Sequence, residues 1–224
     1  MTSARDDILA NIRRSLGVSG AERTRRGVVD ERLERAPKGV IPARGQVSGR
    51  ERLDLFRAQV EAALATITEV ASAADVPAAV AEYLRGHNLP ATIRRGDDPR
   101  LAAMPWDGTA LEVATGVSAG RDLNAVSHAF GAAAETGTLV MVSGPDNPST
   151  LNFLPDNHIV VVDARDVRGD YESALARVRM AYGKGEMPRT VNFITGPSRS
   201  GDIEQTLLLG AHGPRRLHVI VVGG

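Results

Sequence analysis

A run of small polar residues with one arginine follows an apolar segment near the end of the chain: Thr195-Gly196-Pro197-Ser198-Arg199-Ser200-Gly201-Asp202. A loop of this kind between a strand and a helix start directs backbone N–H groups and hydroxyls at one point, and an arginine can form two parallel hydrogen bonds to a phosphate or carboxylate. The segment therefore predicts an anion-binding loop. Its candidate ligand-binding residues are Thr195, Gly196, Ser198, Arg199 and Ser200. The alternative is that Ser200 or Asp202 only caps a helix beginning near Asp202, with Arg199 in solvent.

A glutamate beside a glycine turn precedes another apolar run, in the segment Ala134-Glu135-Thr136-Gly137-Thr138. Glu135 is a candidate catalytic residue, because a partly buried carboxylate has a raised pKa and can serve as nucleophile, general base or hydrogen-bond acceptor. The adjoining candidates for ligand binding are Thr136, Gly137 and Thr138. The alternative is that Glu135 accepts hydrogen bonds from the backbone amides of its own turn. If this segment and the anion-binding loop share one sheet edge, they form one pocket.

The histidines do not predict a metal site. There are five, His87, His128, His158, His212 and His218, and none forms a His-Glu-x-x-His pair or accompanies a carboxylate cluster. His158 begins a buried strand and His212 lies in a glycine-rich turn, so both could reach the sheet edge. We take His158 as a second catalytic candidate, with a structural hydrogen-bonding role as the alternative.

Composition excludes several classes of function. The chain has no cysteine, so a thiol nucleophile, a Cys-ligated zinc site and any cofactor bound by cysteine, including an iron–sulfur cluster, are excluded. Formal net charge is zero, which does not indicate nucleic-acid binding. No apolar stretch approaches the roughly 18 residues of a membrane span, and the N-terminus lacks the apolar core of a signal peptide. We therefore expect a cytoplasmic protein without a membrane span.

The elements that must position these residues fall into two parts. Residues 1–48 are expected to form an N-terminal amphipathic helix and an arginine-rich arm, with the apolar stripe Ile8, Leu9, Ile12 and Leu16 on the helix and a linker from Ala21 to Arg50. Residues 49–224 are expected to form one domain.

Strands and helices alternate in the second part. Apolar runs predict strands at Thr66–Val70, Ala91–Arg95, Ala110–Ala114, Thr138–Val142, His158–Val162, Val191–Thr195 and Leu217–Val222. Helical spacing predicts helices near Leu53–Leu64, Asp75–Gly86 and Tyr171–Tyr182. This alternation is typical of a three-layer αβα sandwich with a mostly parallel, Rossmann-like sheet. Because ligands bind at the carboxyl ends of strands in such sheets, we expect the loop after Thr195 to lie there.

Three segments in this order resemble the LUD-domain family, and in particular its short, lactate utilization protein C type. They are Ala134–Thr138, Phe153–Val162 and Ile194–Glu204, followed by His212-Gly213-Pro214 and Leu217–Ile220. The resemblance covers about Gly49 to Gly224. It implies a fold similar to the ribose-5-phosphate isomerase, CoA transferase and formyltetrahydrofolate cyclo-ligase group. Glu135-Thr136-Gly137 also resembles the Glu-x-Gly setting of the CoA transferase nucleophile.

The resemblance also implies a role in oxidising L-lactate to pyruvate beside partner subunits that carry iron–sulfur clusters. Because this chain has no cysteine, a redox centre would belong to those partners. We then expect a cysteine-free subunit that binds a small anion or an anionic cofactor through Glu135, Thr136, His158, Ser198 and Arg199. Two alternatives remain open: an independent transferase or ligase acting on CoA or a nucleotide, and a non-catalytic assembly protein that docks through residues 1–48. A homodimer is also compatible with the apolar stripe.

Overall fold

The computed structural model describes residues 3–183, 185–200, 208–210 and 212–224, with two compact units, Met1–Val40 and Ile41–Gly224. The first unit holds helices α1 (Ala4–Leu16) and α2 (Arg23–Arg35). Ser3 caps α1 by accepting a hydrogen bond from the Asp6 backbone N–H. Neither helix has a buried residue, and Ile8, Ile12 and Leu16 of the predicted stripe are exposed.

Helix α2 differs from the expected linker. The segment has no apolar period, which is why the pattern did not indicate a helix, but its arginines and glutamates are good helix formers. An ion pair between Arg35 and Glu31, 2.7 Å apart and one turn along α2, adds a small local stabilisation. No helix in the described part of the chain is long and apolar enough to span a membrane.

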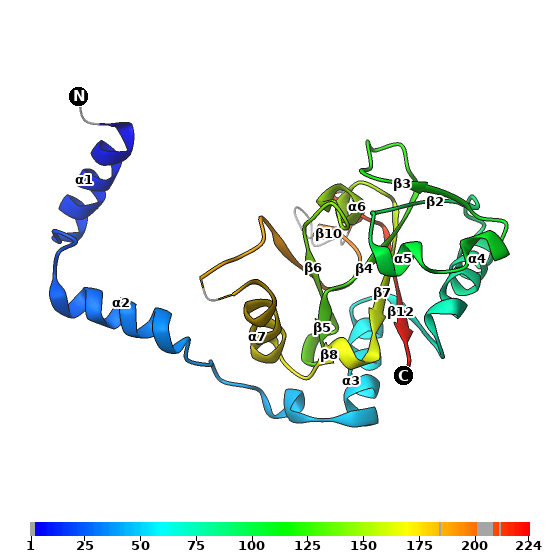
Figure 1. Ribbon diagram of the computed structural model, residues 1–224, viewed down its shortest axis with the longest axis horizontal. Helices are drawn as coiled ribbons and strands as arrows, with labels where there is room; N and C mark the ends of the chain where they lie inside the picture. Colours follow the sequence, from blue (N-terminus) through cyan, green and yellow to red (C-terminus); the bar gives the residue numbers. More distant parts are fainter. Residues whose placement is uncertain (1–2, 184, 201–207, 211) are drawn as a thin grey trace. The chain divides into compact units, whose positions relative to one another are not determined.

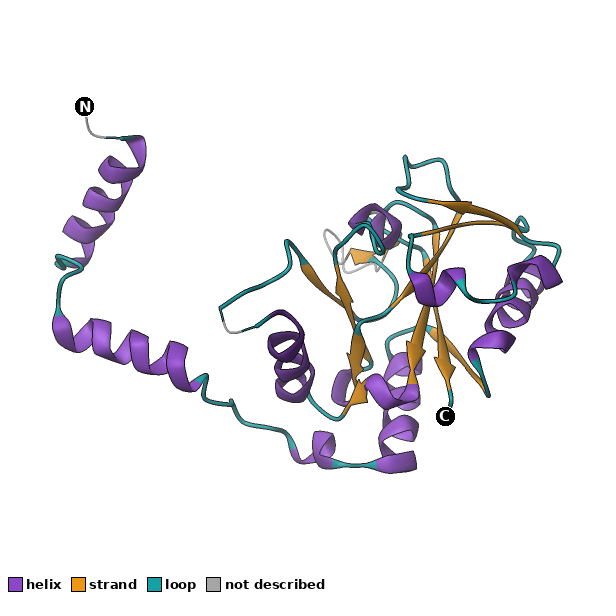
Figure 2. Ribbon diagram, viewed as in Figure 1, coloured by secondary structure: helices purple, strands orange, loops and turns teal. Residues whose placement is uncertain are grey.

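A six-stranded, fully parallel sheet forms the centre of the second unit (Figures 1 and 2), and we call it the main sheet. Its strands, in spatial order, are β1 (Thr66–Val70), β12 (Arg216–Val222), β7 (Asn157–Asp163), β4 (Asn124–His128), β2 (Thr92–Arg95) and β3 (Glu112–Thr115). The central strands β7 and β12 are apolar on both faces, because both faces of the sheet are covered.

Helices lie on both sides of the main sheet. On one side are α4 (Val76–Gly86), α5 (Pro99–Ala102) and Trp106, which pack against Ile159, Val161 and Ile220. On the other side, α3 (Gly49–Ala62) packs through Phe56 and Val60 against Val160 and Val219. This confirms the predicted α/β sandwich architecture.

A second, four-stranded sheet shares the α3 side of the main sheet (Figure 1). Its order is β8 (Val167–Arg168), β5 (Gly131–Ala133), β6 (Thr138–Val142) and β9 (Val191–Ile194), and helix α7 (Tyr171–Tyr182) covers it through Ala174 and Val178. Strand β6 runs antiparallel to both β5 and β9. Two strands that we had expected in the parallel sheet, at 138–142 and 191–195, therefore belong to this second sheet.

The remaining elements are short. They are helix α6 (Ser149–Phe153), the hairpin strands β10 (Arg199–Ser200) and β11 (Leu208–Leu209), and the single turns η1 (Ala43–Gln46), η2 (Ala73–Asp75), η3 (Trp106–Gly108), η4 (Ala134–Thr136) and η5 (Ala164–Asp166). The turn η1 belongs to the second unit, and Gly45 lies against Gly169 and Asp170 at the start of α7.

Candidate ligand-binding site

A hollow of about 230 Å³ lies beneath the loop that follows β9, and we call it the loop hollow. Four segments line it: Asn152–Phe153 of α6, His158 of β7, Phe193–Ser198, and His212–Pro214 with Leu217 of β12. Four of the predicted site residues therefore meet here: His158, Thr195, Gly196 and Ser198.

The loop hollow lies at the amino ends of the main-sheet strands. His158 is the second residue of β7 and Leu217 is the second residue of β12. Our expectation that the loop after Thr195 lies at the carboxyl edge of the parallel sheet is therefore wrong. The reason is that β9 belongs to the second sheet, so its carboxyl end meets the opposite edge of the main sheet.

Hydroxyl groups connect the Glu135 segment to this loop. Thr138 is fully buried, and its Oγ1 lies 2.6 Å from Thr195 Oγ1 and 2.7 Å from the Tyr171 hydroxyl. Thr136 Oγ1 lies 2.7 Å from Thr138 Oγ1 and 3.1 Å from the Tyr171 hydroxyl. The two predicted segments are therefore neighbours, although Thr136, Gly137 and Thr138 do not line the hollow. Tyr171 was not predicted, because it lies 35 residues from Thr136 in sequence.

Glu135 is directed toward the start of α7 and does not line the loop hollow. Its side chain is 4% exposed, and Oε1 accepts a hydrogen bond of 2.9 Å from the Tyr171 backbone N–H. Its own N–H donates to the Gly169 carbonyl oxygen at 3.0 Å. The carboxylate thus satisfies an N–H in the first turn of a helix, where a negative charge is favourable. Glu135 is therefore a hydrogen-bond acceptor, as in the alternative given for it, but the donor N–H belongs to α7 and not to its own turn.

Arg199 is exposed and also lies outside the lining of the hollow. Its Nη2 donates a hydrogen bond of 3.1 Å to the carbonyl oxygen of Ala63, at the carboxyl end of α3, where a cation is favourable. Gly196 packs against the same carbonyl group. Ser200 pairs with Leu208 in the β10–β11 hairpin. The helix expected near Asp202 falls in residues 201–207, outside the described residues.

His158 is almost fully buried in the loop hollow, at 1% exposure, as is Asn152. Its Nε2 lies 3.0 Å from Ser127 Oγ, and its Nδ1 has no hydrogen-bond partner among the described residues. Burial lowers the pKa of His158 to about 3. The ring is therefore neutral near pH 7 and acts there as a hydrogen-bonding group rather than as a cation.

The buried, neutral ring of His158 predicts a pH dependence of stability. Because the unfolded chain takes up a proton near pH 6.5 and the folded chain does so only near pH 3, the free energy of unfolding should fall as the pH drops through this window, by up to about 1.4 kcal/mol per pH unit. Urea unfolding between pH 7 and pH 5 should show a shallower dependence for His158→Gln than for the wild type. His212→Gln, at an exposed position, should keep the wild-type slope. Equal slopes for all three proteins would contradict this explanation.

An ionic cluster that the sequence did not indicate lies at the opposite, carboxyl edge of the main sheet. After β2 the chain proceeds to β3 on one side, and after β4 it proceeds toward β7 on the other, so the connections diverge between β2 and β4. Asp98, 2% exposed, binds Arg100 there through bonds of 3.0 and 2.6 Å. Burial raises the pKa of Asp98, but hydrogen bonds from Arg100 outweigh it and hold the pKa below its usual value. The adjoining hollow has about 50 Å³.

Breaking the Asp98–Arg100 pair should lower the free energy of unfolding more than breaking an exposed ion pair. Asp98→Asn should lower the free energy of unfolding by about 1 kcal/mol, because Asp98 also caps α5 through the Arg100 backbone N–H. Asp54→Asn removes the partner of Arg50 in an exposed pair and should cost less than about 0.5 kcal/mol. Urea unfolding at pH 7 measures both. A larger loss for Asp54→Asn would show that burial does not decide the difference.

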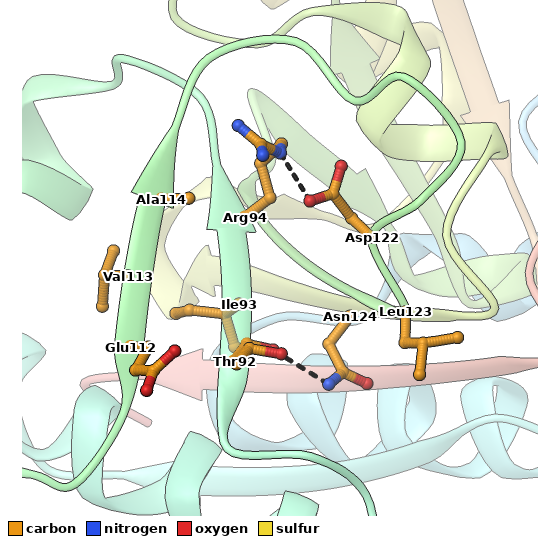
Figure 3. Close-up of a pocket in the computed structure, with 9 residues that line it drawn as sticks. All are labelled: Thr92, Ile93, Arg94, Glu112, Val113, Ala114, Asp122, Leu123 and Asn124. Carbon is orange, nitrogen blue, oxygen red and sulfur yellow. Dashed lines mark hydrogen bonds and ion pairs between the residues drawn. The ribbon is translucent and has the colours of Figure 1, made fainter.

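A third hollow, of about 310 Å³, lies between β2, β3 and residues 122–124 (Figure 3). Arg94, Asp122 and Asn124 in its lining are already paired with neighbouring groups. Arg94 Nε lies 2.7 Å from Asp122 Oδ1, and Asn124 Nδ2 donates to the Thr92 carbonyl oxygen at 3.0 Å (Figure 3). This hollow is therefore a weaker candidate ligand site than the loop hollow.

Comparison with known proteins identifies the family. Residues 53–222 match the model of the LUD domain. The chain belongs to the LUD domain family. This confirms the resemblance inferred from the sequence motifs.

Two relatives of this LUD domain are both named lactate utilization protein C. The one from Geobacillus thermodenitrificans is 35% identical over 144 residues, which is 56% of this chain and 60% of the relative. The one from Geobacillus sp. strain WCH70 is 40% identical over 90 residues, 40% of this chain and 37% of the relative. The match thus spans less than two thirds of each relative.

A solved structure shares the fold of this LUD domain. It is a DUF162 family protein from Deinococcus radiodurans, 27% identical, with a TM-score of 0.60. The likeness covers 79% of this chain and 99% of that protein. The combination of a parallel main sheet with helices on both sides is therefore confirmed by comparison.

Proposed function

We propose that this LUD domain takes part in lactate utilization and binds a small anion or an anionic cofactor in the loop hollow. The name shared by its relatives supports the pathway. The observation that carries the binding site is that Thr195, Gly196 and Ser198 meet the buried ring of His158 around one hollow. The protein acts at this site by binding and orienting its ligand.

Ser198 is the residue best prepared to bind that ligand. Its backbone N–H donates to the Pro214 carbonyl oxygen at 2.8 Å, and its carbonyl oxygen accepts from the Gly210 N–H at 2.9 Å. These two bonds fix the position of the residue, while no hydrogen bond engages its hydroxyl within the described part of the chain. A fixed hydroxyl that can donate to a carboxylate or phosphate loses little entropy on binding.

Replacing Ser198 tests this site. In a strain that lacks its own copy of the gene, we expect Ser198→Ala to slow growth on L-lactate and Ser198→Trp, which fills the hollow, to abolish it. Ser200→Ala is the matched control, because Ser200 lies two residues away but does not line the hollow. Growth should be compared with that on glucose at equal protein levels. Normal growth on L-lactate with Ser198→Trp would refute the proposed site.

The electron transfer that lactate oxidation requires is assigned, in this proposal, to partner subunits with iron–sulfur clusters. The absence of cysteine from all 224 residues supports this assignment. The exposed apolar side chains Ile8, Ile12 and Leu16 of α1 offer one contact for such partners. Affinity purification of the tagged full chain from lactate-grown cells should recover iron, and Ile8→Asp with Ile12→Asp should reduce the recovery. Purification without any associated iron would count against the partners.

A further inference from the structure

Another hollow, of about 500 Å³, lies beside the loop hollow, and we call it the arginine hollow. Pro197 and Leu217 line both hollows, so the two are neighbours. The other lining residues are Leu64, Thr66, Tyr83, His87, Arg215 and Arg216. Thr66 and Arg216 are the first residues of β1 and β12, which places this hollow at the same amino edge of the main sheet.

The lining of the arginine hollow carries positive charge without a carboxylate among its described residues. This is notable because acidic and basic residues are equal in number over the chain, 27 of each. Arg50, by contrast, forms ion pairs with the carboxylates of Asp54 and Glu69. An anionic ligand in the arginine hollow would supply negative charge that its lining residues do not carry.

Both guanidinium groups have donors to spare. Arg216 Nη1 donates to Asn157 Oδ1 at 3.2 Å, and the bond leaves the remaining N–H groups of Arg216 free. Arg215 has no side-chain hydrogen bond or ion pair within the described residues. Its backbone is nevertheless fixed, because its N–H donates to the Asp156 carbonyl oxygen at 2.7 Å, and its aliphatic carbons pack over Gly210.

Packed aromatic rings and a hydroxyl group form another part of the lining of the arginine hollow. The rings of Tyr83 and His218 stack with centroids 4.1 Å apart, and His87 lies 4.3 Å from Tyr83. Thr66 Oγ1 is 2.8 Å from His218 Nδ1, which holds this stack against β1. A preorganised wall of this kind favours a ligand with several oxygens, because few groups have to be ordered on binding.

We propose that the arginine hollow binds the phosphate groups of a nucleoside diphosphate or a similar organic diphosphate, whose organic part extends past Pro197 into the loop hollow. Two guanidinium groups match a diphosphate because each can form two parallel hydrogen bonds to phosphate oxygens. The extension past Pro197 rests on the proposed function of the loop hollow, and it specifies the anionic cofactor as a diphosphate. The phosphate site itself stands on Arg215, Arg216 and their surroundings.

Isothermal titration of the full chain with inorganic pyrophosphate and with ADP tests this proposal. Both probes should bind the wild type, and Arg215→Ala or Arg216→Ala should weaken each by about tenfold or more. Arg179→Ala, an exposed arginine of α7 outside both hollows, is the matched control and should bind like the wild type. Failure of both probes to bind, or unchanged binding by the Arg215→Ala, Arg216→Ala double variant, would overturn the proposal.

One further variant separates this proposal from the function proposed for the loop hollow. Ser198→Trp should weaken ADP at least tenfold and leave pyrophosphate unchanged, because it obstructs only the loop hollow. Equal binding of ADP by Ser198→Trp and the wild type would refute the extension past Pro197. Loss of growth on L-lactate in Ser198→Trp without any diphosphate binding would refute the diphosphate proposal and leave the lactate function standing. Diphosphate binding by the wild type, together with normal growth of Ser198→Trp on L-lactate, would support the diphosphate site and refute the function proposed for the loop hollow.

Discussion

Replacing Gly137 with alanine should lower the free energy of unfolding by about 3 kcal/mol, because two costs add. The residue has φ of +66°, which L-residues with a Cβ adopt unfavourably. An added Cβ would also lie 2.6 Å from Val60 N and 2.7 Å from Gln59 C, on the backbone of α3. Helix α3 would have to move away from the turn between β5 and β6. Urea unfolding at pH 7 measures the loss.

Gly120→Ala is the matched control for this change. Gly120 also has a positive φ, +79°, but no atom lies within 4 Å of the position that its Cβ would take. It should therefore show only the conformational cost, about 1 kcal/mol. If the two variants lose the same stability, the close approach to α3 contributes nothing and the explanation is wrong.

Glu135→Ala should lower the free energy of unfolding by about 2 kcal/mol, because it leaves the partly buried Tyr171 N–H without its charged acceptor. Glu135→Gln keeps an oxygen acceptor at the same place and should lose less than half as much. Thermal unfolding and urea unfolding of the two variants measure the difference. If Glu135→Ala were as stable as the wild type, the carboxylate would have no role at the start of α7.

The same pair of variants distinguishes support of α7 from catalysis. A glutamine cannot replace a carboxylate nucleophile, so a catalytic Glu135 would make Glu135→Gln stable but inactive. If Glu135 only supports α7, Glu135→Gln should grow on L-lactate like the wild type. The geometry favours this second result, since the carboxylate is held at α7 and not at the loop hollow.

Much of the fold could be predicted from local patterns. The runs around Ile159–Val162 and Val219–Val222 are apolar on both faces and form the centre of the main sheet. The segment Asp75–Gly86, with Pro77 in its first turn, forms helix α4 as predicted. These elements were predictable because each is marked by residues adjacent in sequence.

Strand pairing was not predictable in this way. The run at Thr138–Val142 looks like a central parallel strand, because an apolar strand does not reveal which strand it pairs with. Besides the two-residue strands, two strands were missed altogether: β4, which contains Asn124, Ser127 and His128, and β5, which consists of glycine and alanine. Small and polar residues have weak strand propensity, and only burial between neighbouring elements makes them strands.

The residues of the candidate sites also fall into those that a local sequence motif marks and those that only distant contacts bring into place. Ser198, Thr195 and Gly196 were found from one contiguous motif, because a single loop carries them. Arg215 and Tyr171 were not found, since each reaches its site through contacts with distant parts of the chain. Asp98 and Arg100 were missed for the same reason: nothing in their sequence spacing indicates that β2 and β4 diverge beside them.

The position of β12 has a consequence for how a ribosome produces this protein. Thr66 of β1 and His218 of β12 are 152 residues apart, yet their side chains touch, and β12 is the neighbour through which β1 joins the main sheet. Translation thus delivers β1 long before its neighbour exists. Such long-range pairing forms slowly, so β1 of a nascent chain has no neighbour in the main sheet until β12 has been synthesised.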